Sequence, residues 1–268
     1  MVRSAQPLPT GKRLKATDMS SSTDLSYAIG IPARFESTRF PGKPLALLAG
    51  KPMIEHVIER ALATKLGRVI VATDHQGIAD VARAAGAEVA MTRADHENGT
   101  SRLAEAFADI DVDIVINVQG DEPLIDPQAI CAVVAPFTSQ PDLQMATLAH
   151  PIRETADFAD ANVVKVVCNA LGHAMYFSRA AIPFSRNKGE LQTSDMLQHV
   201  GLYAYRRYFL MQYNSLTPCK TEQIEQLEQL RVLHHGYPIA VTSGDFHCLG
   251  VDTPDDLNRA EALIAEQG

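Results

Sequence analysis

The loop that follows the first apolar segment concentrates groups that bind phosphate. Between positions 34 and 43 it carries the cations Arg34, Arg39 and Lys43, together with two hydroxyls and a glycine. Arginine and lysine oppose the charge of a polyphosphate, and hydroxyl and backbone N–H groups donate to its oxygens. Neither the GxxxxGK[ST] pattern of a Walker A loop nor the GxGxxG of dinucleotide-binding proteins is present. Composition alone leaves two interpretations open, a polyphosphate site and a solvated basic loop.

Two aspartates have the residue type and surroundings of metal ligands. Asp121 follows the apolar run 114–118 and comes directly after Gly120, which lets a ligand approach the backbone. Asp252 precedes a predicted helix start much later in the chain. Carboxylate oxygens, completed by phosphate and sugar oxygens, suit Mg²⁺. Each aspartate also has an ordinary structural explanation, Asp121 as a turn residue and Asp252 as a neighbour of a helix cap.

The first half of the chain predicts a scaffold that would bring such residues together. Short apolar runs at 28–32, 68–72, 88–91 and 113–118 alternate with helical patterns at 53–64, 78–85, 101–110 and 127–137. This alternation predicts an α/β fold with a doubly wound, mostly parallel sheet that is covered by helices on both faces. Ligands of such sheets bind beyond the carboxyl ends of the strands, at the topological switch point. The basic loop follows the first of these strands.

Beyond residue 140 the alternation breaks, and an antiparallel hairpin insertion is expected. Strand patterns occur at 145–152, 163–168, 174–177, 201–205 and 238–241, and the second and third of these predict a hairpin. A long helix is predicted over 222–234, with Ile224 and Leu227 facing inward. Thr253 as N-cap, Pro254 at the first helical position and Asp256 two residues later predict the start of a last helix.

Composition is that of a globular protein and excludes several functions. The 268 residues are 46% hydrophobic and 21% charged, and 24 Lys and Arg against 32 Asp and Glu give a formal net charge of −8. This balance argues against nucleic-acid binding, and no apolar run of about 18 residues predicts a membrane span. Four dispersed cysteines are typical of free thiols in a reducing cytoplasm. Residues 1–26 lack apolar periodicity and are expected to be a disordered tail, with Met19 as a candidate initiator.

Several motifs together resemble the sugar nucleotidylyltransferases of the CMP-KDO synthetase type. They are 31–45 (IPARFESTRFPGKPL), 50–54 (GKPMI), 71–75 (VATDH), 91–100 (MTRADHENGT), 117–123 (NVQGDEP), 164–167 (VKVV), 176–179 (YFSR), 225–231 (EQLEQLR) and 250–257 (GVDTPDDL). The resemblance spans about residues 27–260 and implies one nucleotidyltransferase domain of the glycosyltransferase-A-like kind over 27–268. Within it, 27–140 would bind CTP, 141–250 would bind the sugar and form a dimer, and 251–268 would be a C-terminal helix.

The resemblance also implies a reaction and the residues for it. The anomeric hydroxyl of KDO, an eight-carbon acid sugar, would attack the α-phosphorus of CTP and release pyrophosphate, for lipopolysaccharide assembly. Catalytic roles are implied for Arg34, Arg39, Lys43, Asp121 and Asp252, with Asp121 and Asp252 holding Mg²⁺. CTP binding is implied for Ala33, Arg34, Ser37, Arg39, Lys43, Thr73, Asp74, His75, Asn98, Gly99, Thr100 and Ser101. Sugar binding is implied for Gln119, Arg179, His199, Tyr203 and Glu225.

Alternatives from the same class and from another class stay open at this point. A related cytidylyltransferase would activate a sialic-type or 8-amino acid sugar, and Arg179, His199 and Glu225 would discriminate between such sugars. A nucleotide-binding regulator without turnover would not need the pair Asp121 and Asp252. The polar segment 185–196 matches no family motif and is expected to be a loop over the sugar. The family resemblance further implies a homodimer in the cytoplasm, with no membrane or nucleic-acid partner.

Overall fold

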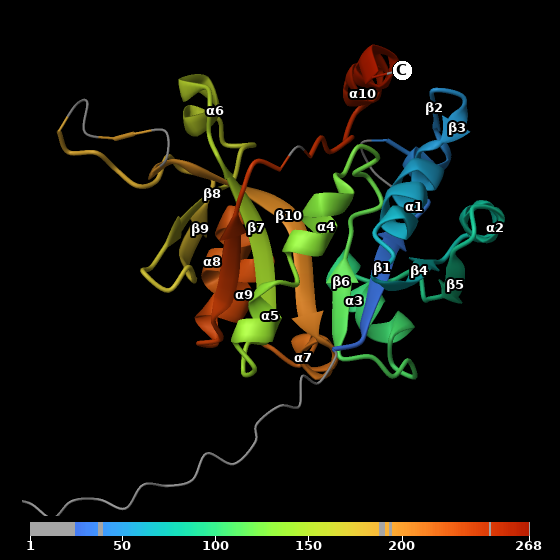
Figure 1. The fold of residues 1–268 in the computed structure, drawn as a ribbon, viewed down its shortest axis with the longest axis horizontal. Coiled ribbons are helices and arrows are strands. Elements are labelled where there is room, and N and C mark those ends of the chain that lie inside the picture. Colours follow the sequence, from blue (N-terminus) through green and yellow to red (C-terminus); the bar gives the residue numbers. More distant parts are fainter. Residues whose placement is uncertain (1–24, 37–39, 188–190, 193–194, 247, 268) are drawn as a thin grey trace, which may run out of the picture.

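A mixed nine-stranded sheet forms the centre of the computed structural model, which describes residues 25–36, 40–187, 191–192, 195–246 and 248–267. The strand order is β11-β7-β10-β6-β1-β4-β5, and β8 pairs with both β10 and β9 (Figure 1). The strands are β1 (Tyr27–Ala33), β4 (Gly67–Thr73), β5 (Glu88–Met91), β6 (Ile114–Asn117), β7 (Met145–Pro151), β8 (Lys165–Cys168), β9 (Ala174–Ser178), β10 (Leu197–Arg206) and β11 (Ile239–Ser243).

Strand directions confirm the predicted sheet. β1 is parallel to β4 and β6, β4 is parallel to β5, and β11 is parallel to β7. β10 runs antiparallel to both β6 and β7, and the β8–β9 hairpin pairs Lys165 with Ser178. The fold is therefore a mostly parallel α/β sheet with an antiparallel insertion. Its first half presents the carboxyl ends of β1, β4 and β6 at one edge.

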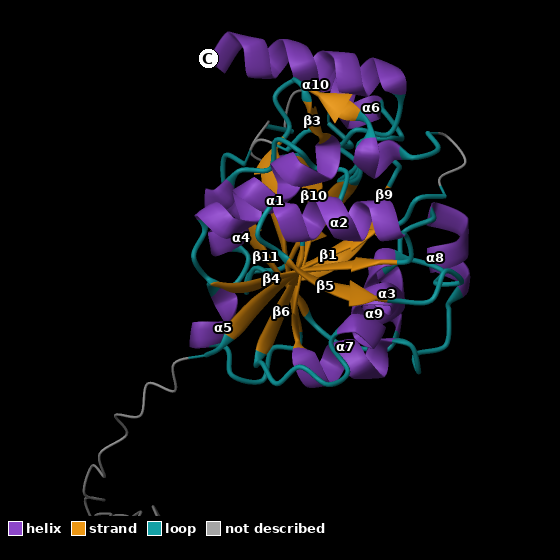
Figure 2. Ribbon diagram, turned by 90° about the vertical axis from the view of Figure 1, so that its right-hand side faces the viewer, coloured by secondary structure: helices purple, strands orange, loops and turns teal. Residues whose placement is uncertain are grey.

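Helices cover both faces of the sheet because each carries an apolar stripe (Figure 2). One face packs against α1 (Met53–Ala63), α2 (Gln76–Ala84), α4 (Pro127–Ala132) and α5 (Pro136–Ser139). The other packs against α3 (Gly99–Ala106), α7 (Arg207–Tyr213) and α9 (Gln229–His234). In α1 the buried residues Ile54, Val57, Ile58 and Ala61 follow the helical spacing that the sequence predicted.

A third, smaller apolar cluster joins the end of the chain to the region after β1. Here β2 (Leu47–Leu48) and β3 (Lys51–Pro52), which follow η1 (Lys43–Leu45), lie near α10 (Pro254–Gln267), and β2 contacts it. Leu48, Met53, Val251 and Ala260 are buried together in this cluster. The predicted start of α10 is confirmed, since Asp256 N donates to Thr253 Oγ1 at 3.2 Å and Thr253 N donates to Asp256 Oδ2 at 3.1 Å.

Two helix predictions are wrong in their extent. The segment 222–234 is not one helix, because Gln226 has a left-handed backbone (φ 56°) that separates α8 (Lys220–Glu225) from α9. As a result Ile224, expected to face inward, is 69% exposed, whereas Leu227 is buried. The segment 127–137 divides into α4 and α5, with Pro136 at the first position of α5. Two short helices, α6 (Thr155–Ala159) and α7, were not predicted.

Two further expectations concern segments that the structure describes in part or not at all. Residues 1–24 of the predicted tail 1–26 lie outside the described residues. The loop 185–196 is described only at 185–187, 191–192 and 195–196. No helix within the described parts of the chain has the length and apolar character needed to cross a membrane.

Candidate functional site

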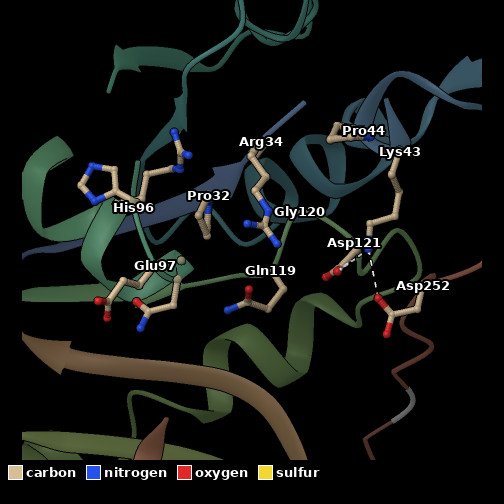
Figure 3. Close-up of a pocket in the computed structure, with 14 residues that line it drawn as sticks. Pro32, Arg34, Lys43, Pro44, His96, Glu97, Gln119, Gly120, Asp121 and Asp252 are labelled. Atoms are coloured by element: carbon tan, nitrogen blue, oxygen red, sulfur yellow. Dashed lines mark hydrogen bonds and ion pairs between the residues drawn. The ribbon is translucent and has the colours of Figure 1, made fainter. Parts of the chain in front are cut away.

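A cavity lies beyond the carboxyl ends of β1 and β6, where the sequence places the candidate phosphate and metal ligands (Figure 3). Two glycines allow the chain segments to meet there. A Cβ atom on Gly120 would lie 2.8 Å from the carbonyl oxygen of Pro32, and one on Gly99 would lie 2.9 Å from Pro32 Cγ. The residues that line the cavity are Pro32, Ala33, Arg34, Lys43, Pro44, His96, Glu97, Asn98, Gly99, Arg102, Gln119, Gly120, Asp121 and Asp252.

Lys43 joins three segments at one end of this cavity. Its ammonium donates to Asp121 Oδ2 at 2.7 Å, to the carbonyl of Val251 at 2.8 Å and to Asp252 Oδ1 at 3.2 Å. Gly42 has a left-handed backbone (φ 70°) directly before η1, which begins at Lys43. Figure 3 shows Arg34 entering the same cavity, with Lys43 ending between the two carboxylates. The two aspartates thus meet although 130 residues separate them.

The carboxylates around Lys43 fit a divalent cation. Asp121 and Asp252 already converge on one positive group, the ammonium, so their oxygens can face a metal ion from two sides. Among the described residues no group of three or more Asp, Glu, His or Cys side chains is placed to hold an ion alone. Mg²⁺ is commonly held by one or two carboxylates and completes its shell with substrate oxygens and water, so the pair suffices.

Glu122 adds a third carboxylate beside this pair, but it faces inward. Its Oε2 atom is buried and has no hydrogen-bond partner among the described residues. Burial, and secondarily the charges of Asp121 and Asp252, raise the pKa of Glu122 to about 8. Near neutral pH the group is therefore largely protonated, which limits the negative charge at this end of the cavity.

The structure places the residues predicted for CTP in two groups. Ala33, Arg34, Lys43, Asn98 and Gly99 line the cavity. Thr73, Asp74, His75, Thr100 and Ser101 do not line it but support its walls. Ser37 and Arg39 lie outside the described residues.

The supporting residues have defined structural partners. Asp74 accepts a hydrogen bond of 3.0 Å from the guanidinium of Arg102, whose side chain is 3% exposed. His75 caps α2 by accepting from Gly77 N, and its ring stacks on Phe35 with centroids 4.1 Å apart. Asn98 and Ser101 form the capping box of α3. These contacts hold the wall formed by the β4–α2 loop and the start of α3.

A buried polar chain runs from the cavity into the second half of the protein. Gln119 Nε2 donates to Asn117 Oδ1 at 3.0 Å, Asn117 Nδ2 donates to Thr100 Oγ1 at 3.4 Å, and Thr100 Oγ1 donates to Glu228 Oε1 at 3.0 Å. Glu228 Oε2 and Gln229 Nε2 are buried without a hydrogen-bond partner among the described residues. Burial raises the pKa of Glu228 to about 7. Buried polar atoms without partners are uncommon, and a bound water molecule, ion or ligand can satisfy them.

Sequence reasoning missed Glu228 and Gln229. Both belong to the motif 225–231, from which only Glu225 was selected. The predicted continuous helix gave no reason to choose these two side chains over their neighbours. In the structure α8 ends before Gln226, and after this break Gln229 and the Oε2 atom of Glu228 are buried. The available signal was the neighbouring pair of polar residues between Leu227 and Leu230, both of which are buried.

Four of the residues predicted for the sugar, Arg179, His199, Tyr203 and Glu225, do not line the cavity. His199 is buried, shares a hydrogen bond of 3.0 Å with Thr147 Oγ1, and has its pKa lowered to about 3 by burial, so the ring is neutral. Tyr203 is buried beside it, with ring centroids 5.4 Å apart. The structure describes all five residues of this predicted group. Of these five, Gln119 alone lines the cavity.

Arg179 and Glu225 hold each other and the local backbone. The Arg179 guanidinium donates to the carbonyls of Glu225 at 2.7 Å and Ala161 at 3.0 Å. The Glu225 carboxylate accepts from Ser178 Oγ at 2.7 Å and from Arg179 N at 2.9 Å. In this conformation both side chains join β9 to α8, so their predicted role in sugar binding would require a rearrangement.

Cationic groups and a carboxylate pair beyond the carboxyl ends of parallel strands lie where open α/β proteins bind ligands such as nucleotides. Residues 28–241 match the family described as cytidylyltransferase. The chain belongs to this cytidylyltransferase family.

Individual relatives agree with that membership. The 3-deoxy-manno-octulosonate cytidylyltransferase of Trichlorobacter lovleyi is 51% identical over 245 residues, which are 88% of this chain and 97% of the relative. The protein of that name from Yersinia pestis is 49% identical over 251 residues, covering 91% of this chain and 100% of the relative. A solved CMP:2-keto-3-deoxy-manno-octonic acid synthetase complexed with CTP has a TM-score of 0.86 and 43% identity, covering 91% of this chain and 100% of its own. The resemblance inferred from the motifs is therefore confirmed.

Proposed function

We propose that this chain transfers CMP from CTP to the anomeric hydroxyl of 3-deoxy-manno-octulosonate (KDO) and releases pyrophosphate. One observation carries this conclusion: Lys43, Asp121 and Asp252 converge at the end of a cavity that Arg34 also lines. Cations for a triphosphate and hard oxygens for a divalent ion are thus in one place. The names of relatives at 51% and 49% identity, and a CTP-complexed structure at 43% identity, support this pair of substrates.

The chemistry asks mainly for positioning and charge stabilisation. Arg34 and Lys43 would bind the triphosphate and offset the charge that grows on the departing pyrophosphate. Asp121 and Asp252 would hold Mg²⁺, which when bound neutralises phosphate charge and lowers the pKa of the attacking hydroxyl. Gly120 lets the end of β6 pack against the end of β1, where these side chains start, because any side chain at this position would meet the carbonyl oxygen of Pro32.

Sugar recognition would use the polar chain that starts at Gln119. Its amide lines the cavity, and the chain continues through Thr100 to Glu228, whose second oxygen has no partner among the described residues. The unpartnered amide nitrogen of Gln229 lies next in sequence. A carboxylate acceptor and an amide donor together match the hydroxyl groups of a sugar. The predicted contributions of Arg179, His199, Tyr203 and Glu225 remain part of this proposal.

A pyrophosphate-release assay tests the proposed function. The purified protein, CTP and KDO are combined with Mg²⁺. In parallel reactions EDTA replaces Mg²⁺, or a sialic-type sugar or 8-amino-KDO replaces KDO. We expect release with KDO and Mg²⁺, little release with EDTA, and weaker release with the other sugars. Absence of release with every sugar contradicts the enzyme proposal, and release that survives EDTA contradicts the metal proposal.

We also propose that the enzyme is a cytoplasmic homodimer that associates through its second half. The β8–β9 hairpin and the following loop expose Leu171 (75%), Met175 (64%) and Phe184 (87%). Met175→Lys should therefore halve the mass measured by light scattering, whereas Leu47→Lys, a matched change at an exposed leucine of β2, should not. The free thiols of all four cysteines support a reducing compartment, which cell fractionation would test.

A further inference from the structure

All three donor protons of Lys43 have partners within the protein. The ammonium contacts Asp121 Oδ2, Asp252 Oδ1 and the carbonyl oxygen of Val251, and the side chain is only 12% exposed. An ammonium group has three donors and no acceptor, so these contacts use its full capacity. In this conformation Lys43 cannot also donate to a triphosphate.

The same contacts engage the carboxylate oxygens that would hold a divalent ion. The ammonium lies 2.7 Å from Asp121 Oδ2 and 3.2 Å from Asp252 Oδ1. Mg²⁺ would need such oxygens at about 2.1 Å, in the space that the ammonium fills, and would meet its positive charge at close range. The lysine and the metal therefore compete for the same carboxylates.

We propose that Lys43 is a placeholder cation, which fills the metal position in the nucleotide-free enzyme and is exchanged for the divalent ion when the nucleotide arrives. This inference rests on the proposed function, because it takes the triphosphate to be the new partner of Lys43. The long flexible stem of lysine permits such a change of partner without movement of η1.

The carboxylates do not depend on Lys43 alone for their positions. Val251 N donates to the carbonyl of Asp121 at 2.9 Å, which ties the two segments together through the backbone. Asp256 Oδ2 accepts from Asp252 N at 3.2 Å and so holds the second aspartate. Removing the ammonium should leave the two carboxylates near each other and take away one positive charge that opposes a metal ion.

Exchange makes metal and nucleotide binding cooperative. A divalent ion that binds alone must take Asp121 and Asp252 away from Lys43, which opposes binding. A triphosphate supplies Lys43 with another anionic partner, so each ligand should increase the affinity for the other by the same factor. The wild-type protein should consequently bind divalent ions weakly without CTP.

The test measures Mn²⁺ binding to the metal-free, full-length protein without nucleotide or sugar, by titration calorimetry and by the EPR signal of free Mn²⁺. Lys43→Met keeps most of the side-chain volume and removes the charge. It should bind Mn²⁺ at least about tenfold more tightly than wild type, the equivalent of one charged hydrogen bond. The control Lys51→Met removes an exposed lysine whose partners are Glu55 and Glu59, and it should bind as wild type does. Equal or weaker binding by Lys43→Met overturns the proposal.

A second readout keeps the proposal testable if Lys43→Met folds poorly. Lys43→Gln retains a polar head without charge, and saturating Mn²⁺ should raise its melting temperature while changing that of the wild type little. The gain in affinity should vanish in the double variant Lys43→Gln/Asp252→Asn, and its persistence there overturns the proposal. Neither experiment uses turnover. A wild-type enzyme without pyrophosphate release would contradict the proposed function, whereas only the Mn²⁺ comparison contradicts the placeholder.

Discussion

Replacing Glu228 by glutamine should make the protein more stable above neutral pH and less active. Burial raises the pKa of this carboxyl from its ordinary 4.5 to about 7. Between these pH values the folded protein binds a proton that the unfolded chain has released. The free energy of unfolding contributed by Glu228 therefore falls as the pH rises from about 4.5 to about 7, and the loss is complete above about 7.

The magnitude follows from the two pKa values. At about 1.4 kcal/mol per pH unit, the change from 4.5 to about 7 corresponds to about 3 kcal/mol. Glutamine keeps the volume and an acceptor for Thr100 Oγ1, now 3.0 Å from Glu228 Oε1, but it has no charge to bury. At about pH 8 the variant should exceed the wild type by about 1–3 kcal/mol, and at about pH 5 the two should be nearly equal.

Equilibrium urea unfolding of both proteins at about pH 5, 6.5 and 8 measures this difference. Glu154→Gln, a change at an exposed carboxylate, serves as the control and should leave the pH dependence of unfolding unchanged. At about pH 8, where the carboxyl group is ionised, the KM for KDO should rise about tenfold or more in Glu228→Gln, because the proposed charged hydrogen bond to the sugar is lost. Two results would refute the conclusion that Glu228 is a buried carboxyl with a raised pKa. They are a variant less stable than wild type at about pH 8, and a stability difference between the two proteins that does not depend on pH.

Three further changes test other parts of the site. Asp252→Asn should lower turnover about 100-fold or more and raise the Mg²⁺ concentration needed for half-maximal activity, measured by pyrophosphate release. Gly120→Ala should cost about 1–3 kcal/mol in urea unfolding and weaken CTP binding in calorimetry, since its Cβ would lie 2.8 Å from the Pro32 carbonyl. Arg102→Lys should lower stability by about 3 kcal/mol in the same unfolding assay, because lysine cannot reproduce the bonds from the buried guanidinium to Thr92 and Asp74.

The fold could be predicted where side-chain periodicity reports burial directly. The run 88–91 coincides with β5, and the apolar spacing of 53–64 gave α1 to within one residue. The break at Gln226 could not be predicted, because a glutamine carries no signal for the left-handed conformation that it adopts there. Tertiary packing, which buries Leu227 and Leu230 below the sheet, selects that conformation against the local helical pattern.

Some residues of the candidate site could likewise be predicted from the sequence, and others could not. Arg34, Lys43 and Asp121 could be placed together because the carboxyl ends of neighbouring parallel strands meet, whatever the rotamers of the side chains. The directions of Arg179 and Glu225 depend on hydrogen bonds between β9 and α8, which sequence spacing does not reveal. For these two residues the sequence predicted contact with the sugar, whereas the structure shows them bonded to each other and to Ser178 and Ala161.

The position of Asp252 depends on the packing of the C-terminal helix. Val251 is buried with Leu48, Met53 and Ala260, so this residue fastens α10 to the region after β1. Its N–H donates to the carbonyl of Asp121 and its own carbonyl accepts from Lys43. Any movement of α10 is thereby passed to Asp252 and to Lys43 through one buried residue. The spacing of the carboxylate pair therefore depends on how α10 docks, although 130 residues separate the two aspartates.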